Sequence, residues 1–239
     1  LLYIGHCEMS LKDYHIARSA YEKVLAIEEA SPRHRAAARN RLDHIQRIED
    51  RGPQPQWKLA FSDDFDREEI GEDWEVLLGE WHVEDGTLRS GSDHAEIVIA
   101  RPFAGLHKFE LEITTPADTA RPCDFSPAIQ SHVPDSSGQL HTTGYWLQFG
   151  GAGNTLNRIL RNGREIQRQA LDRYIKPGHV HHMVAEFDGE MVRLIVDGVT
   201  VMQASDSAPL LGFEHRTVGL VTYNVAHVKS VQVYTAEPL

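Results

Sequence analysis

The chain has 239 residues, of which 41% are hydrophobic, so it is long enough for one large domain or two smaller ones. Its formal net charge is -11, and Lys and Arg form no cluster, which excludes nucleic acid and anionic lipid surfaces as partners. No apolar run approaches about 20 residues, so nothing in the sequence predicts membrane insertion. Its two cysteines, Cys7 and Cys123, have neither the spacing of a zinc site nor that of a disulfide framework.

Residues 1 to 50 have the composition of α-helices, with very few Gly or Pro residues. Asp13 is a predicted N-cap for a helix that carries Ala17 and Tyr21 on its apolar face. Ser31 is a second predicted N-cap, and Pro32 then occupies the first helical position. Because the chain opens on Leu rather than Met, within a helical pattern, we expect it to be part of a longer multidomain protein.

Residues 51 to 56, RGPQPQ, form a predicted linker because Gly and Pro end helices and favour extended chain. Residues 57 to 239 then consist of fifteen short runs of alternating apolar and polar residues, separated by Gly, Pro, Asp and Asn. This pattern predicts a mostly β fold, a jelly-roll β-sandwich of two antiparallel sheets.

The clearest local signal is a predicted hairpin between His181 and Gly198. Two runs with period-two alternation flank Asp188-Gly189, and a second Asp-Gly pair, Asp197-Gly198, closes the segment. Asp-Gly between alternating apolar runs is a strong hairpin signal.

Several segments together resemble a known superfamily. They are FSDDFD (61–66), Trp74, GEWHVEDGTL (79–88), the hairpin, VGL (218–220) and the last run, 228–234. This combination resembles the concanavalin A-like lectin/glucanase superfamily. Within it, the chain resembles the laminin-G-like and 3-keto-disaccharide-hydrolase-like branch of bacterial proteins (domain of unknown function 1080). The resemblance covers residues 57 to 236 and implies that the first and last strands are neighbours.

The helical segment resembles a tetratricopeptide repeat. Ile4-Gly5 matches the Leu-Gly pair of that family, and Ala17 and Tyr21 match its small and aromatic positions, whereas Glu8 departs from it. The resemblance implies a protein partner for this segment. A single repeat does not bury its own apolar face, so we expect either further repeats before Leu1 or packing on the β domain.

Two clusters raise the question of metal binding. Asp63, Asp64 and Asp66 offer hard oxygen ligands, and the superfamily resemblance implies a structural calcium between this segment and an acid on the last strand. Here Ser230 stands at that last-strand position, so a solvated turn with an Asx cap is the favoured alternative. His179 and His181 share a strand face opposite to His182, and two histidines without a third ligand favour a structural role.

The predicted ligand-binding residues combine aromatic rings with planar polar groups, as sugar recognition requires. Strand alternation places Tyr145 on the core side of its strand and Trp146 with Gln148 on the other side. The full set is Trp146, Gln148, Tyr145, Arg158, Arg161, His132, Tyr223 and Asn224.

No catalytic motif accompanies this set. Glu110 and Glu112 share a strand face, but Thr114 and Thr115 follow where the glucanases have a third acid. We therefore predict a non-catalytic module that binds carbohydrate or another extracellular polymer and requires no cofactor, in an extracytoplasmic or periplasmic compartment. The alternatives are a glycoside hydrolase of the 3-keto-disaccharide-hydrolase type and a purely structural or interaction domain.

Overall fold

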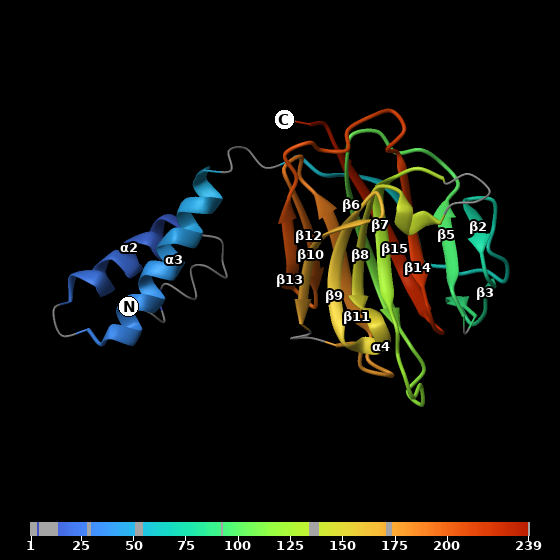
Figure 1. Ribbon diagram of the computed structural model, residues 1–239, viewed down its shortest axis with the longest axis horizontal. Coiled ribbons are helices and arrows are strands. Elements are labelled where there is room, and N and C mark those ends of the chain that lie inside the picture. The colour runs from blue at the N-terminus through green and yellow to red at the C-terminus, as the bar shows by residue number, and fades with distance from the viewer. Residues whose placement is uncertain are drawn as a thin grey trace. The chain divides into compact units, whose positions relative to one another are not determined.

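The computed structural model describes residues 4, 14–27, 30–50, 55–91, 93–133, 139–170 and 174–238. The chain divides into two compact units, Leu1–Gln54 and Pro55–Leu239 (Figure 1). The first unit is helical and the second is a β-sandwich.

The helical unit contains α2 (Tyr14–Ala26) and α3 (Pro32–Asp50). The helices pack through one small apolar cluster, in which Ala17 and Tyr21 are buried with Ile45. The backbone N–H of His34 donates to Ser31 Oγ at 3.2 Å, which confirms the predicted N-cap. Asp13 and Gly5 lie outside the described residues. Within those residues, neither helix has the length and apolar character that a bilayer crossing needs.

The β unit has fifteen strands within the described residues, and each overlaps a predicted run. The eight-stranded sheet has the order β13-β12-β11-β6-β15-β4-β3, and β1 also pairs with β15. Its strands are β1 (Lys58–Asp63), β3 (Trp81–Val83), β4 (Leu88–Ser90), β6 (Leu106–Thr114), β11 (His181–Phe187), β12 (Met191–Val196), β13 (Val199–Ser205) and β15 (His227–Ala236).

The seven-stranded sheet has the order β10-β9-β8-β7-β14-β5-β2 and lies nearer the viewer in Figure 1. Its strands are β2 (Trp74–Leu78), β5 (Ala95–Ile99), β7 (Phe125–Ser131), β8 (Tyr145–Gly150), β9 (Leu156–Arg161), β10 (Arg164–Ala170) and β14 (Thr217–Thr222). Two short helical turns, η1 (Leu140–Thr142) and α4 (Gly151–Asn154), flank β8. All strand pairs are antiparallel, which confirms the predicted sandwich.

The predicted hairpin is formed by β11 and β12, with Phe187 opposite Val192. Asp197-Gly198 then connects β12 to β13, and both residues have positive φ, 50° and 75°. Two positive φ angles in a two-residue connection define a type I′ turn, whose twist suits a hairpin.

The first and last strands are neighbours, as the superfamily resemblance implied. β1 pairs with β15 so that Asp63 lies opposite Val231. This pairing places the acidic segment beside the last strand.

Side-chain alternation in the seven-stranded sheet produces two apolar layers. Tyr145, Leu147 and Phe149 point into the main core between the sheets. Trp146 points the other way and belongs to a smaller cluster with Leu140 of η1. The turn η1 therefore covers part of the outer face of this sheet, and this outer face carries the candidate site.

Candidate functional site

A buried polar network crosses strands β7, β8 and β9 on the outer face of the seven-stranded sheet. Gln148 Nε2 donates to Asp124 Oδ2, and Arg158 Nε donates to Gln148 Oε1. Ser126 Oγ also donates to Asp124 Oδ2, at 3.1 Å. Asp124 and Gln148 are buried, whereas Arg158 is half-buried. The network therefore presents one accessible guanidinium above a planar amide and a carboxylate.

Burial has the largest effect on the pKa of Asp124. It raises the pKa of this carboxyl to about 6, although hydrogen bonds from Gln148 and Ser126 act in the opposite direction. The second oxygen, Oδ1, is buried without a hydrogen-bond partner within the described part of the chain. Asp124 is therefore a carboxyl that gains or loses a proton close to neutral pH.

Tyr223 supplies the accessible aromatic ring of this face. Its ring stacks on the His94 imidazole with a centroid separation of 4.2 Å and an interplanar angle of 8°. The side chain is 37% exposed. The pKa of the Tyr223 phenol is raised to about 12, mainly by burial and then by the negative charges of Asp124 and Glu96. The phenol therefore lies within electrostatic range of both acids of the face.

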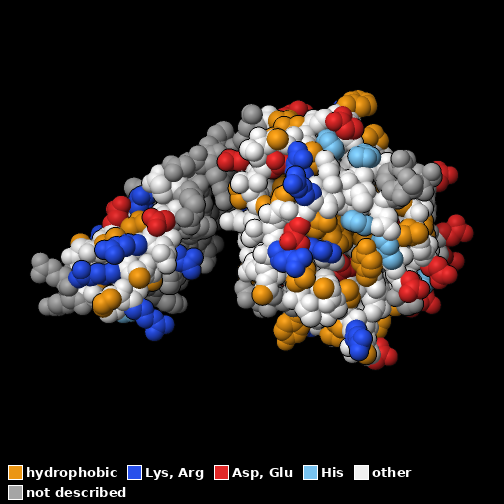
Figure 2. Space-filling model, in the orientation of Figure 1, with side chains coloured by type: hydrophobic (Ala, Val, Ile, Leu, Met, Phe, Trp, Pro, Cys, Tyr) orange, Lys and Arg blue, Asp and Glu red, His pale blue; other side chains and the backbone are white. Residues whose placement is uncertain are grey.

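A second polar group on the same face contains His94, Glu96 and His141. Glu96 lies on β5 and is buried, and its Oε2 accepts a 2.8 Å hydrogen bond from the backbone N–H of Leu140. His94 Nε2 lies 2.9 Å from Glu96 Oε1. One ligand atom from each of the three residues lies within 4.8 Å of the others. In Figure 2, histidine and hydrophobic side chains gather over the middle of this sheet.

Trp146 faces outward, as strand alternation predicted, but as a predicted ligand-binding residue it needs correction because it is buried. The side chain is 1% exposed. The His141 ring lies 5.5 Å from its ring, and the Arg158 guanidinium lies 5.4 Å from its centroid. Because η1 folds back over β8, Trp146 forms the floor of the face.

Tyr145 also needs correction, because it belongs to the core between the sheets. Its ring packs 5.0 Å from that of Phe187, and its hydroxyl donates to Asp206 Oδ2 at 2.6 Å. A ligand on either outer face does not reach it. The even spacing from Phe149 on the same strand fixes this orientation.

Three further predicted residues lie outside the network. Arg161 pairs with Asp206 at 2.6 Å. His132 is exposed just beyond the end of β7. Asn224 holds the loop after β14, where its side chain donates to the Arg121 carbonyl at 2.8 Å. From the predicted set, the structure therefore brings together Gln148, Arg158 and Tyr223 on the outer face, with the buried Trp146 ring beneath Arg158.

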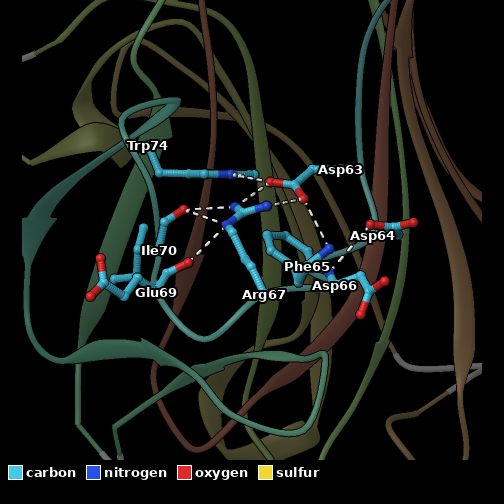
Figure 3. Close-up of polar contacts among 8 residues, drawn as sticks. All are labelled: Asp63, Asp64, Phe65, Asp66, Arg67, Glu69, Ile70 and Trp74. Atoms are coloured by element: carbon cyan, nitrogen blue, oxygen red, sulfur yellow. Dashed lines mark hydrogen bonds and ion pairs between the residues drawn. The ribbon is translucent and has the colours of Figure 1, made fainter.

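The expected calcium segment is organised by an arginine (Figure 3). Arg67 donates to both carboxylate oxygens of Asp63, each at 2.6 Å, and Trp74 Nε1 donates to Oδ2 at 2.7 Å. The backbone N–H of Phe65 donates to Oδ1 at 2.9 Å. Burial acts to raise the pKa of Asp63, but these hydrogen bonds outweigh it and lower the pKa below its ordinary value.

This arrangement does not fit a calcium ion at Asp63. Each carboxylate oxygen already accepts two hydrogen bonds, and a guanidinium occupies the position of the cation. Asp63, Asp64 and Ser230 do line one recess between β1 and β15. Asp64 Oδ1 accepts a 3.3 Å hydrogen bond from the Asp66 N–H, as in the predicted Asx cap. The segment is stabilised by an ion pair.

The histidines before and in β11 acquire a third polar neighbour that the sequence pattern did not reveal. His181 Nδ1 and His179 Nε2 lie 3.0 Å and 3.4 Å from Asp197 Oδ2, in the turn after β12. The three residues line a cavity of about 330 Å³. Asp197 Oδ1 also accepts the His182 N–H at 3.0 Å, so this cluster fastens the hairpin.

Sequence reasoning missed both acids of the outer face. The signal for Glu96 was present, since it is the one charged residue in the apolar run AEIVI, and every residue of β5 is buried. Asp124 stands just before β7 without a comparable signal. His141 reaches the face only because η1 folds back over β8.

No protein-family profile and no curated protein sequence matches this chain. Solved structures do match. The carbohydrate recognition domain of Emp47p superposes with a TM-score of 0.59 at 12% identity, covering 75% of this chain and 97% of that one. The exoplasmic/lumenal domain of VIP36, in a Ca²⁺/Man3GlcNAc-bound form, gives 0.56 at 10% identity, covering 76% and 92%. An endo-β-1,3-glucanase from Pyrococcus furiosus gives 0.54 at 11% identity, covering 77% and 97%.

These similarities establish the fold. The β unit shares the two-sheet sandwich fold of these carbohydrate-recognition, lumenal and glucanase domains. Membership in the superfamily and its particular branch, and the tetratricopeptide resemblance, remain predictions. One fold carries many functions, so the function has to be inferred from the outer face of the seven-stranded sheet.

Proposed function

We propose that the β unit is a non-catalytic carbohydrate-recognition module whose ligand lies on the outer face of the seven-stranded sheet. The observation that carries this proposal is the Asp124–Gln148–Arg158 network with the Tyr223 ring on the same face. Sugar hydroxyls need planar donors and acceptors held in fixed orientation, and a half-exposed ring offers an apolar face to a sugar. The network supplies the planar donors and acceptors, and Tyr223 supplies the apolar ring face.

The similar structures support this proposal without deciding it. Two of them are named for carbohydrate recognition or carry a bound glycan, and they share this fold. We propose that binding needs no calcium at Asp63, because Arg67 already neutralises that carboxylate. The protein-docking role expected of the helical unit stays a prediction, as does membership in a larger bacterial protein outside the cytoplasm.

Glycan binding by the whole chain tests the proposal. A glycan array identifies the sugar, and calorimetry then compares Arg158→Ala and Tyr223→Ala with Lys229→Ala, an exposed residue on the opposite sheet. The first two variants should each weaken binding by at least about tenfold, or 1.4 kcal/mol, and the control should not. Absence of glycan binding, or equal affinity in all variants, contradicts the proposal.

One observation favours a second candidate, a glycoside hydrolase. Glu96 and Asp124 are two buried acids on the same outer face. Glu96 lies opposite Val221, which lies opposite Ser126, and Asp124 stands two residues before Ser126. Two strand spacings and this two-residue offset separate the backbones of the two acids by about 12 Å. Inverting hydrolysis needs carboxyl groups about 6.5–9.5 Å apart, so these side chains would have to lean toward each other. The raised pKa of Asp124, about 6, suits a general acid. Release of reducing ends from a bound glycan would favour this candidate.

A further inference from the structure

We propose that His94, Glu96 and His141 bind one divalent transition-metal ion of the zinc class. Their ligand atoms converge within 4.8 Å of one another, from β5, the residue before it and η1. This proposal stands independently of carbohydrate binding, because it concerns three side chains outside the Asp124–Gln148–Arg158 network.

The convergence leaves three buried polar atoms without hydrogen bonds. They are His94 Nε2, Glu96 Oε1 and His141 Nδ1. The first two lie 2.9 Å apart, but they lack the alignment that a hydrogen bond needs. A buried polar atom without a partner is costly, and one bound cation would satisfy all three.

Each ligand side chain is held in place by its neighbours. The His94 ring stacks on Tyr223, and the His141 ring lies against Trp146. Glu96 uses only Oε2 for the Leu140 N–H, which leaves Oε1 for an ion. That same hydrogen bond anchors η1 and so positions His141, the residue after Leu140. The site is therefore preorganised.

The His179–His181–Asp197 cluster provides a contrast within the same chain. Its contacts are already made: His181 Nδ1 contacts Asp197 Oδ2, and Lys176 N donates to His181 Nε2 at 3.3 Å. Asp197 Oδ1 accepts the His182 N–H. The polar atoms of this cluster are already in contact with one another without an ion. The His94–Glu96–His141 group is therefore the better candidate for a metal site.

The donor set selects the class of ion. Two imidazole nitrogens and one carboxylate oxygen suit zinc and related transition metals, whereas calcium prefers six or more oxygens. Glu96 is buried, but both histidines are partly accessible. Three protein ligands leave a tetrahedral ion one further position, which a water molecule or a ligand oxygen fills.

Titration of the metal-free full chain with ZnCl₂ tests this proposal. Calorimetry should show one ion per chain with micromolar or tighter affinity, and Zn²⁺ should raise the Tm. Glu96→Gln and His141→Ala should each weaken binding by at least about 100-fold, since even the loss of an outer-shell partner costs 10–100-fold. His179→Ala is the matched control and should bind as the parent chain does.

Two further measurements keep the outcome decisive. The visible spectrum of bound Co²⁺ should be lost in His141→Ala and retained in His179→Ala. Circular dichroism should show that Glu96→Gln, which preserves an acceptor for Leu140 N–H, remains folded without metal. Failure of the parent chain to bind zinc, or loss of binding in His179→Ala but not in His141→Ala, overturns the proposal.

Discussion

At the scale of single residues, Asp63 illustrates how one ion pair fixes a loop. Its carboxylate receives four hydrogen bonds, two of them from Arg67. We predict that Asp63→Asn lowers the free energy of unfolding by about 2 kcal/mol, because charge-assisted hydrogen bonds are lost in a mostly buried position. Urea denaturation measures this change. Asp64→Asn, in an exposed neighbour, should stay within about 0.5 kcal/mol of the parent chain.

The same carboxylate makes this difference dependent on pH. Its pKa is lowered in the folded state, so its contribution is present above the unfolded pKa of about 4 and is lost as pH falls through the folded pKa. The stability gap between the parent chain and Asp63→Asn should therefore shrink below about pH 4.

Adding CaCl₂ to metal-free protein should leave the Tm unchanged. A calcium-dependent rise in Tm that Asp63→Asn abolishes would show that calcium does bind at Asp63.

Asp124 should show the opposite pH dependence. Burial raises its folded pKa to about 6, above the unfolded value of about 4, so the folded state binds the proton more tightly. Its contribution to stability is present below about pH 4 and is lost as pH rises to about 6. We compare the free energies of unfolding of Asp124→Asn and the parent chain at two pH values. The variant should gain on the parent chain by of order 2 kcal/mol between pH 4 and pH 7.5. Equal differences at both pH values would show that Asp124 titrates normally.

At the scale of elements, two turn glycines separate backbone strain from steric clash. Gly198 has φ +75°, and a Cβ there meets no atom within 4 Å. Gly105 has φ +84°, and a Cβ there would overlap the Ala236 carbonyl oxygen at the end of β15. We predict that Gly198→Ala costs about 1 kcal/mol through strain alone and that Gly105→Ala costs at least twice as much. Thermal unfolding of both variants checks this order, and equal losses would contradict it.

Elements were predictable where the signal is local. Asp197-Gly198 and Ser31-Pro32 specify their turn and cap through side chains a few residues apart, and both form as predicted. Alternation likewise placed Trp146 on the outer face. Its burial was not predictable, because η1 is brought over β8 by a hydrogen bond between Leu140 and Glu96, 44 residues apart in sequence. The candidate site depends on such long-range contacts, whereas the positions of the strands along the chain are visible in local alternation.

At the scale of the whole molecule, the two units differ in the size of their buried apolar cores. The main cluster of buried apolar residues lies entirely between Phe61 and Ala236. The helical unit has only a small cluster around Tyr21 and Ile45 within its described residues. Short helices with little buried surface are marginal in water. We therefore expect residues 55 to 239 to be the unit that folds by itself.

Deletion of residues 1 to 54 should leave the β unit intact in both stability and function. The strands, the Asp124–Gln148–Arg158 network and the His94–Glu96–His141 group all belong to residues 55 to 239. The truncated chain should therefore retain the Tm of the main unfolding transition within about 2 °C, a shift that corresponds to about 0.5–1 kcal/mol at this size. It should also keep the affinity of the full chain for zinc and for whichever glycan the array identifies. Calorimetry on both chains measures these quantities. A large fall in Tm would show that the helices complete the core, whereas loss of ligand affinity at unchanged Tm would show that they contribute to the binding face.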